Sequence, residues 1–411
     1  MKATDETVAL EDVLDSRYSW MRMIVSFLIG GLGIGGIWSV VVAIPELQAE
    51  FGLDRADATL AYISATVGFA IGNFTLGRFV DRYGIAMPLL LGGIVLGAGF
   101  ILTGLAPNFS LVLLLQCVIG LGASTSFSPL MADVSHWFLR RRGIAVSLAA
   151  SGSYIGGVVW PLVVGKLITI DDWRLAYIVL GVICIVCIVP LSLLLRRRLP
   201  GHGMPIAADA PSGATRVIAL SPAAVQWLLV GVGFAASFAM AMPHTQLVAM
   251  SSDLGFTITQ GAAMMSLVFG GGVFSRLAYG LLADRLGAIA IMLIGCTAMA
   301  ASLFVFIPFD TLWVLYLASL AFGLAHGGIL PNLVLVVREF LPAREAGRRV
   351  GVVVGSTVVG VASGSWVFGS LRDLTGTYQI AFFASVATSL AAVAILAYMR
   401  FRAAAAIAAR T

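Results

Sequence analysis

Apolar stretches of roughly twenty residues recur along this chain, and each is long enough to cross about 30 Å of hydrocarbon. The connections between them are short, as expected where lipid offers irregular backbone no hydrogen-bond partner. The predicted spans cover residues 21–45, 58–79, 86–106, 110–133, 143–168, 174–195, 223–250, 259–282, 288–308, 312–337, 349–371 and 378–400. The sequence therefore predicts an all-α membrane protein with twelve transmembrane helices.

Composition supports this class and excludes several others. Of the 411 residues, 60% are apolar and 11% are charged, whereas about a quarter of the residues of a soluble domain are charged. The pair Cys184 and Cys187 lies in an apolar run, without the second ligand pair of a zinc site or a redox-fold pattern. We therefore predict no metal site, no cofactor and no catalytic residue.

Basic residues indicate how the chain is oriented. With a cytoplasmic N-terminus, most of the arginines at the ends of the spans fall in inner loops, and the outer loops keep Arg55, Lys166, Arg174 and Arg372. This positive-inside bias predicts that both termini are cytoplasmic. We expect a bacterial inner membrane, a monomer, and no binding of nucleic acid.

A Pro- and Gly-rich segment lies at the midpoint of the chain, and the first residues are acidic and lack the features of a secretory signal. The predicted organisation is a cytoplasmic tail at 1–19, a six-helix bundle at 20–195, a cytoplasmic linker at 196–222, a second six-helix bundle at 223–401 and a cytoplasmic tail at 402–411.

An internal duplication relates the two bundles. The segment Gly77-Arg-Phe-Val-Asp81-Arg82-Tyr-Gly84 after the second span recurs as Gly280-Leu-Leu-Ala-Asp284-Arg285-Leu-Gly287 after the eighth, and Gly156 recurs as Gly360. Two pseudo-symmetric halves with a ligand site between them, near the bilayer midplane, are typical of transporters.

The duplicated segment resembles the loop signature of the major facilitator superfamily, which implies that fold. We assign its residues to a cytoplasmic gate, in which an Asp at a helix end pairs with an Arg and releases it when the halves rock. The predicted gating residues are Gly77, Asp81, Arg82 and Gly84, with Gly280, Asp284, Arg285 and Gly287 in the second half.

A narrower resemblance rests on His136-Trp137-Phe138-Leu-Arg140-Arg141-Arg142-Gly143 and on Asp253-Leu254-Gly255, which is followed by Arg276. These residues resemble the monocarboxylate transporter and oxalate:formate antiporter branch. The resemblance implies that a small carboxylate is carried and that Arg276 engages it. Gly272 stands where animal members carry an Asp, and no Lys lies between Trp20 and Pro45, so both proton symport and anion exchange stay open.

Arg276 is the most informative residue on physical grounds. It lies eight positions before Asp284, about 12 Å deeper along a helix that rises 1.5 Å per residue. An Arg at that depth costs several kcal/mol unless it faces a water-filled cavity or a partner. Its guanidinium could hold a substrate carboxylate, or it could bond backbone carbonyls and brace the helix.

Further polar residues in the spans are candidates with equally good structural alternatives. His244, His326 and Asp133 could bind a co-transported proton, or form hydrogen bonds within the bundle and at the gate. His244 could also contact the substrate, as could Trp38, Tyr154 and Gln246, although interhelical hydrogen bonds would also satisfy such side chains. The small-residue pairs Gly68/Gly72, Gly152/Gly156 and Gly351/Gly355 predict close helix packing.

The leading functional hypothesis is secondary active transport of a small organic anion, a monocarboxylate, by alternating access with proton symport or anion exchange. A proton-driven exporter of drugs or metabolites is the second. A membrane-embedded enzyme is disfavoured, because it would need His, Asp or Glu side chains clustered at one depth.

Overall fold

The computed structural model describes residues 14–139, 141–197, 218, 220–341 and 346–408, and every regular element among them is a helix. Eleven spans in this part of the chain are long and apolar enough to cross a membrane. Helix α4 occupies the place of the remaining predicted span, and its polar side chains lower its hydropathy. The predicted all-α membrane class is confirmed.

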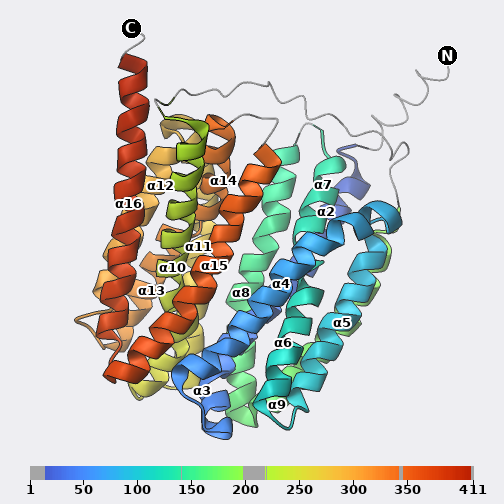
Figure 1. Ribbon diagram of the computed structural model, residues 1–411. Helices are drawn as coiled ribbons and strands as arrows, with labels where there is room; N and C mark the ends of the chain where they lie inside the picture. Colours follow the sequence, from blue (N-terminus) through green and yellow to red (C-terminus); the bar gives the residue numbers. More distant parts are fainter. Residues whose placement is uncertain (1–13, 140, 198–217, 219, 342–345, 409–411) are drawn as a thin grey trace, which may run out of the picture. The chain divides into compact units, whose positions relative to one another are not determined.

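The chain divides into two compact units, which we describe separately. The first comprises residues up to Phe51 and Leu60–Ala207. Its helices are α2 (Arg17–Ile37), α3 (Ser39–Phe51), most of α4 (Arg55–Tyr83), α5 (Ala86–Gly104), α6 (Phe109–Ser124), α7 (Ser128–His136), α8 (Arg142–Ile170) and α9 (Trp173–Leu194) (Figure 1).

The second unit comprises Ala208–Thr411 together with Gly52–Thr59, which includes the first turn of α4. Its own helices are α10 (Pro222–Asp253), α11 (Ile258–Leu286), α12 (Ala288–Val305), α13 (Leu312–His326), α14 (Ile329–Phe340), α15 (Ala346–Thr375) and α16 (Gln379–Ala408).

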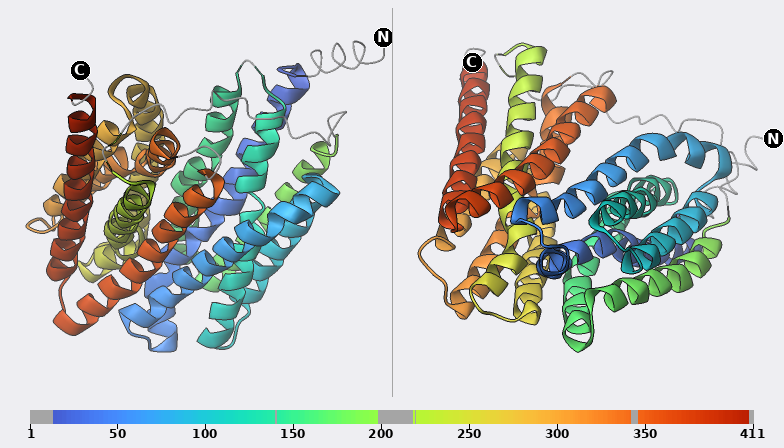
Figure 2. Two further views of the ribbon diagram at one scale, coloured as in Figure 1. Left: turned by 45° about the horizontal axis from the view of Figure 1, so that its top comes forward. Right: turned by 60° about the horizontal axis from the view of Figure 1, so that its bottom comes forward.

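Both units pack their helices in the same scheme. In the first unit α2 packs on α8, and α5 packs on α9 and α6 (Figure 2). In the second unit α10 packs on α15, and α12 packs on α16 and α13. Counted within each unit, the first span packs on the fifth, and the third span packs on the sixth and the fourth. The duplication seen in the sequence therefore extends to the packing.

Three predicted spans are each broken into two helices, where the sequence analysis expected one. The first breaks at Trp38, after a Gly-Gly pair. The fourth breaks at residues 125–127, before Pro129 in the first turn of α7, where a proline costs no hydrogen bond. The tenth breaks at Gly327 and Gly328. Broken helices in transporters are typical of the segments that line a binding site.

Pro243 lies inside α10 without breaking it. A proline has no N–H for the carbonyl four residues earlier, which here belongs to Ala239. The hydroxyl of Ser385 on α16 donates to that carbonyl at 2.7 Å. The backbone acceptor released by Pro243 is therefore used in helix packing.

The small-residue faces are only partly as predicted. A Cβ placed on Gly152 or Gly156 would strike the backbone of α2, so this pair does permit close packing. Gly351 and Gly355 have no described atom within 4 Å of such a Cβ, and the prediction for them is wrong. Gly360 and Gly364, further along α15, instead approach the backbone of α10 at Phe234 and Phe238.

Candidate functional site

Two histidines meet inside the second unit. The rings of His244 on α10 and His326 at the end of α13 are nearly perpendicular, with centroids 4.9 Å apart, and both side chains are buried. Phe269 of α11 stacks parallel to His244 at 5.7 Å, and Phe322 stacks on His326 at 4.8 Å. We call His244 and His326 the histidine pair.

The hydrogen bond of His326 determines which ring nitrogen carries the proton when the ring is neutral. Its Nδ1 lies 3.1 Å from the carbonyl oxygen of Phe322. A carbonyl can only accept, so Nδ1 carries the proton and Nε2 keeps its lone pair. The pair would resist taking up two protons, because two unit charges about 5 Å apart repel by roughly 3 kcal/mol at an effective dielectric constant of about 20.

Arg276 lies on the helix that contacts this pair. It is half-buried on α11, within the candidate span Ile258–Ala283. It follows Phe269 by seven residues, close to two helical turns, so both side chains project from nearly the same face of α11, about 10 Å apart along the axis. Arg276 therefore projects from the face of α11 that also carries Phe269, the ring that stacks on His244.

Gly272, one turn before Arg276, serves packing in this chain. A Cβ on Gly327 would strike the backbone of Gly272, so α11 and the break between α13 and α14 approach closely here. Ser275 strengthens the contact by donating to the carbonyl of Gly323 at 3.2 Å.

Gln246 is placed away from the histidine pair. It follows His244 by two residues on α10 and so points to another side of the helix. It is fully buried, and its Nε2 lies 3.3 Å from the hydroxyl of Thr59 and 3.5 Å from the carbonyl of Ser365. These contacts fit the structural alternative considered for this residue.

Trp38 and Tyr154 belong to the first unit. Trp38 lies at the junction of α2 and α3, half-buried, and stacks on Tyr62 of α4 with centroids 5.7 Å apart. Tyr154 is half-buried on α8. A role of either in binding substrate stays a prediction.

Asp133 has a partner that the sequence analysis did not identify. Arg22 of α2 donates to both of its carboxylate oxygens, at 2.6 and 2.8 Å. Arg22 is 2% exposed, lies over the Trp137 ring with Cζ 4.5 Å from the centroid, and also donates to the Tyr18 hydroxyl. Arg22, a charged residue inside the first predicted span, was the signal in the sequence that could have indicated this pair.

A second ion cluster lies at the end of α10. A single carboxylate oxygen of Asp253 accepts from Arg55 at 2.8 Å, from Arg372 at 3.0 Å and from the Tyr378 hydroxyl at 2.7 Å. Burial raises the pKa of Tyr378, so its phenol stays protonated and donates. The carboxylate of Asp373 accepts from the backbone N–H of Arg55 and thereby caps the start of α4. Arg55 is the first residue of α4 and is buried, and its predicted place on the outer side stays a prediction.

The two motif copies end alike. Gly84 and Gly287 have φ angles of 73° and 85°, a region that favours glycine, and each ends a helix. Arg82, Gly280 and Arg285 are exposed at or near these helix ends. The surroundings of Gly77 and the side chains of Asp81 and Asp284 lie outside what the structure describes. The pairing of Asp with Arg at the gate therefore stays a prediction. No group of three metal-ligating side chains was found in the part of the chain that the structure describes.

The chain is similar in sequence to known families and proteins. The profile of the Major Facilitator Superfamily matches residues 26–248 and 228–409. Monocarboxylate transporter 11 of Homo sapiens is 29% identical over 390 residues, covering 90% of this chain and 80% of that protein. Monocarboxylate transporter 13 of Bos taurus is 26% identical over 396 residues, covering 93% and 89%. The Fujikurins efflux protein of Gibberella fujikuroi is 27% identical over 382 residues, covering 87% and 79%.

Among solved structures, a bacterial homologue of the human lysosomal transporter Spinster, in an inward-facing and occupied conformation, superposes with a TM-score of 0.72. The match covers 94% of this chain and 98% of that chain at 16% sequence identity. At this identity the likeness concerns the fold alone.

Proposed function

Because this chain belongs to the major facilitator superfamily, we propose that it carries a small organic anion, a monocarboxylate, across a membrane by alternating access. The family and the relatives are transporters, so the chain is an integral, multi-pass membrane transporter and not an enzyme. The named relatives are fungal and mammalian and do not support a bacterial inner membrane. Cytoplasmic termini remain our proposal from the positive-inside bias.

The observation that carries the proposal is the place of Arg276. An ionisable residue inside a membrane span marks a functional site by default, and Arg276 shares a face of α11 with Phe269, which stacks on His244 of the histidine pair. A guanidinium binds a carboxylate through two parallel hydrogen bonds. One cation balances one carboxylate, which favours monoanions over dianions. The relationship to the two monocarboxylate transporters supports the same substrate class.

A thermal-shift screen of the purified protein tests the substrate class. We expect small monocarboxylates to raise the melting temperature more than dicarboxylates of similar size. A ligand at 100 times its Kd stabilises the folded state by about 2.7 kcal/mol. The Arg276→Ala variant is the control and should not respond.

The screen also tests the second candidate function, the export of an amphipathic compound. The relationship to the Fujikurins efflux protein favours this alternative. Stabilisation by amphipathic compounds, with no response to any carboxylate, would replace the carboxylate proposal with it.

For coupling, we propose that the histidine pair takes up one proton together with the anion. Symport of one proton with one monoanion is electroneutral, so the membrane potential does not oppose uptake. The stacked Phe269 and Phe322 rings can stabilise one imidazolium. Asp133 is the weaker candidate, because its protonation would break its pair with Arg22.

Uptake into proteoliposomes with an imposed pH gradient tests this coupling. We expect an acidic exterior to accelerate uptake several-fold in the natural protein. His326→Asn should abolish the acceleration and leave exchange of internal for external anion intact, because exchange needs no proton. If the natural protein ignores the gradient but responds to internal anion, exchange replaces symport.

A further inference from the structure

A pocket of about 210 Å³ lies in the first unit, where α2 and α5 begin and α7 and α9 end. The transport proposal makes no use of it. Both arginines and apolar side chains line it. We call it the arginine pocket, with Arg22, Arg196, Arg197, Met87, Leu90 and Leu193 in its lining.

Among the described residues that line this pocket, the charges leave a surplus of two cations. Arg22 is neutralised by its bidentate pair with Asp133. Arg196 and Arg197 follow directly after α9 and are exposed. Arg197 is held at the pocket, because its Cζ lies 5.3 Å from the centroid of the Tyr18 ring and its carbonyl accepts from Arg22. Paired guanidinium groups of this kind favour phosphate.

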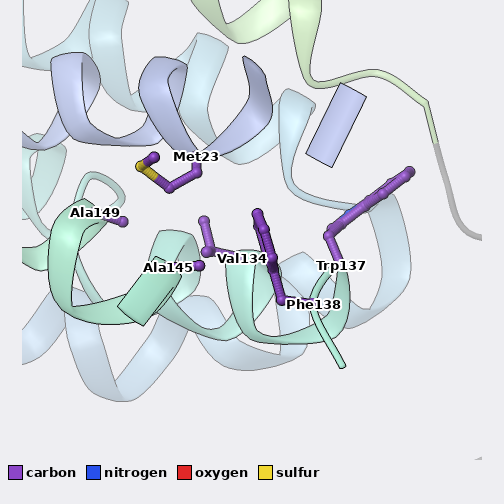
Figure 3. Close-up of a cluster of buried hydrophobic side chains, with 6 residues drawn as sticks. All are labelled: Met23, Val134, Trp137, Phe138, Ala145 and Ala149. Atoms are coloured by element: carbon purple, nitrogen blue, oxygen red, sulfur yellow. The ribbon is translucent and has the colours of Figure 1, made fainter. Parts of the chain in front are cut away.

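The packing beside the pocket is built around Arg22 and its neighbours. Met23, Val134, Trp137 and Phe138 form a buried apolar cluster with Ala145 and Ala149 (Figure 3). Trp137 belongs both to this cluster and to the wall of the pocket, where it is 1% exposed. At Trp137 the wall of the pocket is therefore part of this buried cluster.

The apolar lining continues onto exposed apolar side chains. Met87 is 47% exposed and Leu193 is 37% exposed, and both lie at the ends of candidate membrane spans. Leu194, the last residue of α9, is 51% exposed. A ligand with a charged group at the arginines and an apolar tail would therefore find a matching surface for each part.

The size of the pocket limits what fits inside. Pockets for drug-sized ligands measure about 300–1,000 Å³, and this one is smaller. It can admit a phosphate with a short polar group, whereas acyl chains would have to remain outside along the exposed apolar side chains.

We propose that the arginine pocket binds the phosphate headgroup of an anionic phospholipid, with the acyl chains along Met87 and Leu193. Basic pockets between transmembrane helices at one membrane surface are suited to such headgroups. The bound lipid ties the end of α9 to the starts of α2 and α5. The proposal does not depend on which substrate is transported.

The test compares the melting temperature of the full chain in phosphatidylcholine nanodiscs with and without a minor fraction of phosphatidylglycerol. We expect the anionic lipid to raise it. Arg196→Gln and Arg197→Gln should each weaken the apparent lipid affinity about tenfold, since charge-assisted hydrogen bonds to phosphate are lost. Arg400→Gln is the matched control, an exposed arginine on α16, and should behave like the natural protein.

Further measurements distinguish lipid binding in the arginine pocket from attraction to general surface charge and from binding of a free anion. Ala86→Phe fills the pocket and keeps both arginines, so it should also abolish the rise in melting temperature that phosphatidylglycerol causes. The proposal would be overturned if Arg400→Gln lost this rise to the same extent, or if Arg196→Gln and Arg197→Gln kept it unchanged. A gain from inorganic phosphate in phosphatidylcholine alone, lost in Arg197→Gln, would replace the lipid with a soluble anion.

Discussion

Replacing Arg276 with lysine is expected to reduce transport about 10- to 150-fold while the protein folds normally. Lysine keeps the positive charge but lacks the planar fork that binds a carboxylate at two points. Loss of one hydrogen bond to a charged group costs about 1.5–3 kcal/mol, which corresponds to that range of rates. The measurement is initial uptake of the best ligand from the thermal-shift screen, at matched protein content.

Two controls make this result specific. Arg276→Gln removes the charge as well as the fork and should reduce transport further. Arg400→Lys makes the same chemical change on the exposed surface of α16 and should leave uptake unchanged. If Arg276→Lys transports as fast as the natural protein, Arg276 does not hold the substrate. The membership of the chain in its transporter family would be unaffected.

Breaking the Arg22–Asp133 pair is expected to lower stability by about 3–5 kcal/mol, the usual effect of leaving one buried charge without its partner. Arg22 is almost fully buried, and the side chain of Asp133 is 11% exposed. Asp133→Leu would leave the guanidinium, among the residues that the structure describes, with the Tyr18 hydroxyl and the carbonyl of Arg197 as acceptors. We expect a large fall in melting temperature and in the yield of monodisperse protein.

The double variant Arg22→Met with Asp133→Leu distinguishes the charge effect from lost packing. Replacing both members of a buried ion pair by apolar residues of similar volume is often neutral or stabilising, so the double variant should be more stable than Asp133→Leu. Glu50→Gln is a comparison at a more exposed pair, with Arg174, because it removes one charge and keeps an oxygen that can accept from Trp173; we expect a change of at most about 1 kcal/mol. A melting temperature of Asp133→Leu equal to that of the natural protein would contradict the argument.

Both ion pairs show why side-chain partners are difficult to derive from sequence. Asp133 and Arg22 are 111 positions apart, and Arg55 and Asp253 are 198 apart. Whether two such residues meet depends on the rotation of each helix about its axis and on the register between helices, and hydropathy fixes neither. The same reason applies to His244 and His326, which were separate candidates in the sequence and form one pair in the fold.

Some glycine roles can be predicted from the sequence and others cannot. Gly84 and Gly287 follow from the sequence, because a helix end with positive φ is a local property that favours glycine. The choice between Gly351/Gly355 and Gly360/Gly364 as the packing face of α15 could not be made, since both pairs have the same spacing. Only the direction in which α10 crosses α15 decides between them.

The sequence by itself determined the helical class, the places of the spans and the duplication into two halves, because the length and hydropathy needed to cross lipid are local properties of each segment. It also singled out Arg276, since a charge inside a span is visible without knowing the fold. The tertiary structure alone decided which charges are matched, where three spans break, and that an arginine pocket forms at the ends of four helices. These features depend on the angles and register at which the helices pack, and many sequences with the same apolar pattern would set those differently.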